Sequence, residues 1–160
     1  MALWHGWGIS QEGVEIDRRQ YTGLRCTLFQ NDLEAPNVII SLVGWRAEHK
    51  WHGRGAAHRL DDEIESIIAA VRYWWEEEAD CDDGDAIRHL LRLHPDATDA
   101  ELIALHRRYE AETLALLEDP ALWSKIERVA AELVALGEIS ATQAHRLAGY
   151  PDPRLPAPIW

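Results

Sequence analysis

Imidazole and carboxylate side chains gather in one short part of the chain. His49, His52 and His58 lie there with Glu48 and with the acidic residues 61–63. Nitrogen and oxygen donors of these types are ligands that zinc takes in proteins. The spacing is not that of an established ligand pair, because His49 and His52 are three residues apart and no HExxH motif sets two imidazoles one helical turn apart. The cluster by itself therefore favours solvated residues at a helix end over a metal site.

Other chemistry finds little support in the residue pattern. The serines lie in no GxSxG context, no glycine-rich phosphate-binding loop is present, and the two cysteines form no CxxC pair. Nucleophilic hydrolysis, nucleotide binding and a thiolate zinc site are thus poorly supported. Four further histidines are dispersed along expected helices and are predicted to lie at the surface: His89, His94, His106 and His145.

Length, composition and charge limit the class of protein. A chain of 160 residues suffices for one domain with a core, and no apolar run approaches the roughly 20 residues of a membrane span. The net charge of -12 argues against nucleic-acid binding, which needs clustered cations. The start, MALWHGWGIS, lacks the features of a secretory signal, so we expect a cytoplasmic protein. The acidic run EEEADCDDGD, residues 76–85, is predicted to be a solvated turn between helices rather than a cation site.

Two short strands are expected near the start of the chain, and helices after them. Residues 14–16 and 23–29 are β-branched and alternating, which is typical of a hairpin. A helix is predicted from Pro36 to about His52, where Gly53 stops it. The next helix begins near Asp61 and has one apolar face, formed by Ile64, Ile67, Ile68, Val71 and Trp74.

The second half of the chain continues the helical pattern. Helices are predicted over residues 86–93, 98–117 and 120–136, the second opened by a capping box of Thr98 and Glu101. Ser140 caps a last short helix. The fold class is α+β and predominantly α: a short N-terminal β-hairpin followed by an array of five to six helices. Residues 1–148 form the predicted domain, and residues 149–160 form a proline-rich tail.

A resemblance to a known family follows from Gly44, Ala47, Glu48 and Gly53, read together with the order of elements. A hairpin, a helix carrying Gly-x-x-Ala-Glu with a glycine after four more residues, and then a helix with an acidic start resembles the peptidase domain of FtsH-type zinc metalloproteases and their small stand-alone relatives. The segment of residues 121–147 also looks like the family's terminal helix pair. The resemblance implies a zinc ion whose third ligand is a carboxylate at the start of the second helix, which here falls on Asp62 or Glu63.

One departure from the family bears directly on activity. The resemblance implies an HExxH helix before the hairpin, and the 160 residues contain no such motif. Either the motif is encoded upstream of Met1, or the lineage has lost it; as written, the chain is expected to bind no zinc and to be an inactive peptidase with no catalytic residue. The alternative is a non-enzymatic acidic helical module that binds a protein or peptide. Without the HExxH helix that the resemblance implies, Gly44 and Ala47 would lie on an exposed apolar groove, able to support a homodimer.

Overall fold

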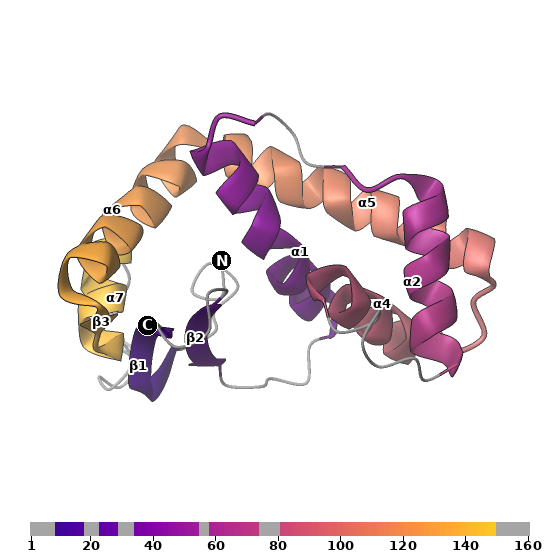
Figure 1. Cartoon of the computed structure of the whole chain (residues 1–160), viewed down its shortest axis with the longest axis horizontal. Coiled ribbons are helices and arrows are strands. Elements are labelled where there is room, and N and C mark those ends of the chain that lie inside the picture. Colours follow the sequence, from indigo (N-terminus) through magenta and orange to yellow (C-terminus); the bar gives the residue numbers. More distant parts are fainter. Residues whose placement is uncertain (1–8, 18–22, 29–33, 55–57, 74–80, 150–160) are drawn as a thin grey trace, which may run out of the picture. The chain divides into compact units, whose positions relative to one another are not determined.

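The computed structural model describes residues 9–17, 23–28, 34–54, 58–73 and 81–149, which belong to two compact units (Figure 1). Unit 1 comprises residues 1–31 and 119–160, and unit 2 comprises residues 32–118. Six helices and three short strands lie in the described ranges. The predominantly helical character predicted from the sequence is confirmed. The single domain predicted over residues 1–148 spans both units and stays a prediction.

Unit 2 is an array of four helices: α1 (Glu34–Trp51), α2 (Asp61–Tyr73), α4 (Asp82–Leu93) and α5 (Asp99–Glu118). α1 packs against α4 and α5, and α2 packs against the same two helices (Figure 1). Apolar side chains from all four helices are withdrawn from water, which stabilises the array. The largest fully buried ones are Val38, Leu42, Ile64, Ile68, Ile87, Leu90, Leu102 and Leu117.

The predicted apolar face of α2 is confirmed where the structure describes it. Ile64, Ile67 and Ile68 are buried and Val71 is half-buried, while Trp74 lies outside the described residues. The capping box at the start of α5 is also confirmed, since the amide of Thr98 donates to Glu101 Oε2 at 2.7 Å and the amide of Glu101 donates back to Thr98 Oγ1 at 3.3 Å. Local sequence signals thus define both helices.

Gly53 ends α1 in a left-handed conformation, with φ of 65°. Its amide donates to the Lys50 carbonyl at 3.0 Å, and the amide of Arg54 donates to the His49 carbonyl at 3.0 Å. These bonds satisfy carbonyl groups that the last helical turn leaves unpaired. A glycine is favoured here because a side chain in this conformation is strained.

Replacing Gly53 with alanine is expected to lower the free energy of unfolding by about 1 kcal/mol. A Cβ at this position would meet nothing within 4 Å, so the loss comes from the backbone conformation alone. Urea unfolding followed by circular dichroism measures it. Glu65→Ala, at an exposed position of α2, is the control and should change stability by less than about 0.5 kcal/mol. Equal stabilities of the two variants would contradict the role of Gly53.

The acidic run is not a solvated turn over its described part, and the prediction is wrong there. Cys81 caps α4, its Sγ accepting from the amide of Gly84 at 3.4 Å, and residues 82–85 form the first helical turn. Carboxylates in this position interact favourably with the positive end of the helix. Asp83 is moreover fully buried. Residues 76–80 of the run lie outside the described residues.

Unit 1 combines two helices with three short strands. β1 (Ile9–Asp17) lies between β2 (Gly23–Leu28) and β3 (Glu138–Ile139), and both pairings are antiparallel. Val14 takes part in both pairings, since it lies opposite Cys26 of β2 and opposite Ile139 of β3. β3 was not expected, because two residues are too few to show an alternating pattern. The connection between β1 and β2, residues 18–22, lies outside the described residues.

The helices of unit 1 begin and end as the sequence predicts. α6 (Pro120–Leu136) is capped by Asp119 and closed by Gly137 at φ of 82°. α7 (Ala141–Ala148) follows a capping box of Ser140 and Gln143. A small core joins α6, β3 and α7 through Leu133, Ile139, Ala141 and Ala144. Residues 150–160, nearly all of the predicted tail, lie outside the described residues.

Candidate functional site

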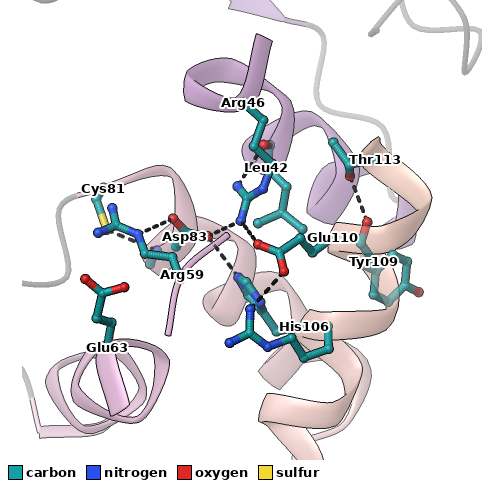
Figure 2. Close-up of polar contacts among 12 residues, drawn as sticks. Leu42, Arg46, Arg59, Glu63, Cys81, Asp83, His106, Tyr109, Glu110 and Thr113 are labelled. Atoms are coloured by element: carbon teal, nitrogen blue, oxygen red, sulfur yellow. Dashed lines mark hydrogen bonds and ion pairs between the residues drawn. The ribbon is translucent and has the colours of Figure 1, made fainter. Parts of the chain in front are cut away.

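A buried arginine lies on the inner face of α1, at the centre of unit 2. Arg46 follows Leu42 by one helical turn, and its Nη1 donates to the Leu42 carbonyl at 2.9 Å. Its Nη2 donates to Asp83 Oδ1 of α4 at 3.0 Å and to Glu110 Oε1 of α5 at 2.6 Å (Figure 2). The Arg46 side chain has no exposed surface. One guanidinium therefore connects three helices, and we call Arg46, Asp83, His106 and Glu110 the buried charge network.

Asp83 accepts hydrogen bonds from four side chains. Besides Arg46, they are the indole Nε1 of Trp45 at 3.1 Å, Arg59 Nε at 3.1 Å and His106 Nε2 at 2.9 Å. Burial by itself would raise the pKa of Asp83, but the hydrogen bond from His106 and the charge of Arg46 hold it far below its usual value. Asp83 is thus an ionised carboxylate inside the unit at neutral pH.

Glu110 is the second buried carboxylate of the network. His58 Nδ1 lies 3.2 Å from its Oε2, and Arg107 Nη1 donates to the same oxygen at 2.8 Å. Burial acts to raise the pKa of Glu110, and the hydrogen bonds from Arg46, His58 and Arg107 lower it more strongly, so the result is a lowered pKa. Each carboxylate is therefore compensated by several cations or donors, as buried charges require.

The paired Asp83 and His106 side chains could in principle move a proton between them. Both are fully buried, however, so a substrate would not reach them in the arrangement that the structure shows. Within the described residues, Arg46 Nε and His106 Nδ1 have no hydrogen-bond partner. Unpaired buried nitrogen atoms reduce the stability that the network contributes. The arrangement suits holding α1, α4 and α5 in register rather than catalysis.

Four residues carry the resemblance, and they lie along α1 and just after it: Gly44, Ala47, Glu48 and Gly53. The place where a Cβ of Gly44 would stand is 2.6 Å from Asp82 Oδ2, so the start of α4 approaches α1 closely at this glycine. Ala47 is half-buried, and Glu48 is exposed and 3.9 Å from His52 Nε2. Trp45 and Arg46 lie between Gly44 and Ala47, and both donate hydrogen bonds to Asp83.

The two candidate zinc ligands lie in the first turn of α2, and both are exposed. Asp62 Oδ1 accepts from the amide of Glu63 at 3.0 Å, and Glu63 Oε2 accepts from the amide of Leu60 at 2.7 Å. Both carboxylates thus accept from backbone amides at the start of α2. None of the contacts drawn in Figure 2 joins Glu63 to the buried charge network.

Zinc does not fit the residues that the structure describes. His49 packs edge-on against the Trp45 ring at 5.0 Å, while His52 and His58 approach different carboxylates. In the described ranges, no three side chains of His, Cys, Asp or Glu are grouped so as to hold a metal ion. A single carboxylate or a pair of them binds zinc weakly. The described residues thus lend no support to the zinc site that the resemblance implies, and that site stays a prediction.

Two of the histidines predicted at the surface are buried, and that prediction is wrong for them. His106 is fully buried and His145 is 6% exposed, whereas His89 is half-buried next to Glu34 and His94 is exposed. A signal was available in α5, where polar residues occupy inner positions of a stripe that begins and ends with leucine. The stripe is Leu102, His106, Tyr109, Glu110, Thr113 and Leu117.

Comparison with known proteins yields no relative. No protein-family model, no curated protein and no solved structure matches the chain. Among the described helices, none has the length and apolar character to cross a membrane.

Proposed function

We propose that the chain is a degenerate or N-terminally truncated zinc-metallopeptidase-like domain that does not hydrolyse peptide bonds with its own residues. The observation that carries the proposal is the arrangement of Gly44 and Gly53 on and after α1, with Asp62 and Glu63 in the first turn of α2. Gly53 has the left-handed backbone that favours glycine, and Asp82 occupies the space that a side chain at Gly44 would fill. The backbone conformation at Gly53 and the close approach of Asp82 to Gly44 thus explain why glycine is favoured at both positions.

Zinc analysis and a peptidase assay on the purified 160-residue chain test the enzymatic part of this proposal. We expect substoichiometric zinc and no cleavage of an unstructured fluorogenic peptide, because the described residues bring no imidazole pair to Asp62 or Glu63. A truncated gene product and a degenerate domain would both give this result. Stoichiometric zinc, or cleavage abolished by a chelator, would contradict the proposal.

Translation of the DNA upstream of the Met1 codon separates the two forms of the proposal. An in-frame HExxH there supports truncation, and the extended protein would then be an active peptidase. A stop codon or an unrelated sequence excludes truncation. A domain without the motif would keep the helices of unit 2 and lack the groups that activate water.

A second candidate function is a protein-interaction module, and exposed apolar side chains favour it. In unit 2, Trp51 is 55% exposed, Leu60 is 64% exposed and Tyr73 is 69% exposed. Large aromatic side chains are enriched at protein interfaces. Light scattering across a concentration series tests self-association, and a monomer at every concentration would exclude a homodimer as the form of this module.

A further inference from the structure

Residues 58–60 connect towards α2 without regular secondary structure, and we call them the strap. The side chains of His58 and Arg59 are 56% and 33% exposed, and Leu60 is 64% exposed. The strap thus places no apolar side chain in the core. Its described side-chain contacts with the rest of unit 2 are polar or cation–π: His58 with Glu110, and Arg59 with Asp83 and Trp45.

Arg59 occupies a defined position between an aromatic ring and a carboxylate. Its guanidinium carbon lies 5.1 Å from the centroid of the Trp45 ring. Its Nε donates to Asp83 Oδ2 at 3.1 Å (Figure 2). The same oxygen accepts from the indole Nε1 of Trp45. A planar cation can stack on the ring and hydrogen-bond to the carboxylate at once, whereas an ammonium group lacks the plane.

The ring and the carboxylate are held in place without the strap. Trp45 belongs to α1 and Asp83 to α4, and these two helices pack against each other. Arg46 and His106 also hold Asp83, both from buried positions. The Arg46 guanidinium lies 4.8 Å from the Trp45 centroid as well, but it is bound to two buried carboxylates and cannot exchange. Arg59, by contrast, is 33% exposed and holds one carboxylate only.

We propose that Trp45 and Asp83 form a binding site for an arginine side chain of a partner polypeptide, and that Arg59 fills this site when the partner is absent. The net charge of -12 attracts a basic partner over a longer range. The proposal does not depend on the peptidase-like origin, because neither Trp45 nor Asp83 is a candidate zinc ligand.

Occupation by Arg59 makes the site self-inhibited. A group tethered by a short segment competes at an effective concentration of the order of millimolar. An incoming arginine binds only the fraction of molecules in which Arg59 has left, so its apparent affinity falls by that fraction. His58 and Arg59 are partly exposed, whereas the carboxylates that they contact are buried. Both carboxylates keep their hydrogen bonds from Arg46 when the strap leaves, so we expect the strap to open without unfolding the helices.

Arg59→Ala in the full chain tests the proposal with N-acetylarginine amide as the probe. The indole Nε1–H resonance of Trp45, assigned with Trp45→Phe, reports occupation of the site by NMR. We expect the variant to bind this probe at least about tenfold more tightly than the parent, and N-acetyllysine amide much more weakly. Affinity equal to the parent's, or no preference for arginine over lysine, would overturn the proposal.

Arg59→Lys covers the case in which the alanine variant does not fold, because it keeps the charge and removes the planar group. The arginine probe should shift the Trp45 resonance of this variant at lower concentration than that of the parent. Arg54→Ala removes an exposed cation that precedes the strap in the sequence, and this variant should bind the probe as the parent does. If Arg59→Lys and Arg54→Ala respond alike, the site does not select guanidinium.

Discussion

Replacing Arg46 with methionine is expected to lower the free energy of unfolding by about 3–5 kcal/mol, the largest effect of any substitution considered for this protein. The guanidinium is fully buried and lies between Asp83 and Glu110. Methionine fills much of the volume but leaves two carboxylates without their shared cation in a medium of low dielectric constant. Chemical denaturation followed by tryptophan fluorescence measures the loss.

A matched control and a rescue variant separate charge from packing. Arg88→Met removes a partly exposed arginine paired with Asp85, and it should change stability by less than about 1 kcal/mol. Neutralising both carboxylates in the Arg46→Met background, with Asp83→Asn and Glu110→Gln, should recover part of the loss. A loss below about 1 kcal/mol for Arg46→Met alone would mean that Arg46 is not buried between the carboxylates.

Acidification is expected to lower the free energy of unfolding by about 2–3 kcal/mol between pH 5 and pH 2, the amount that one strongly paired carboxylate contributes. The pKa values of Asp83 and Glu110 are lowered in the folded chain by their donors and cations. Such groups stabilise the fold fully above the carboxylate pKa of the unfolded chain. The stability is lost as the pH falls through the lower pKa of the folded chain.

Urea unfolding at a series of pH values measures this dependence, and two variants define its origin. Asp83→Asn should be less stable at neutral pH and should lose part of the slope, because the titrating carboxylate is gone. Ile87→Val, at a fully buried position of the same helix, should be less stable by about 1 kcal/mol at every pH and keep the slope. Identical slopes in both variants would exclude Asp83 as the source.

The elements of the fold could be predicted from the sequence wherever the signals are local. Thr98 and Glu101, or Ser140 and Gln143, determine a helix start within four residues, and Pro120 and Gly137 do the same for the ends of α6. β3 could not be predicted in this way, because its two residues become a strand only through pairing with β1.

The site was harder to predict because its contacts join distant residues. Arg46 lies 37 positions from Asp83 and 64 from Glu110 along the chain. Viewed singly, Asp83 belongs to an acidic run and His106 to a charged helix, and both look solvated. In the sequence, only the polar residues at inner positions of the apolar faces of α1 and α5 indicated a buried network. Gly44, Ala47 and Glu48 were singled out for the resemblance, but their neighbours Trp45 and Arg46 make the contacts with Asp83.

The sheet of unit 1 has a consequence for the order of events during synthesis. β1 leaves the ribosome early, while its partner β3 is made only after the whole of unit 2, residues 32–118. Unit 2 is continuous in sequence and can fold as soon as α5 is complete. The β1–β3 pairing must wait until β3 has been made. This pairing closes a long loop, which has an entropic cost. A folded unit 2 reduces that cost, because it shortens the part of the loop that is free chain. We expect unit 1 to be the last part to form and the part that a nascent-chain chaperone meets unpaired.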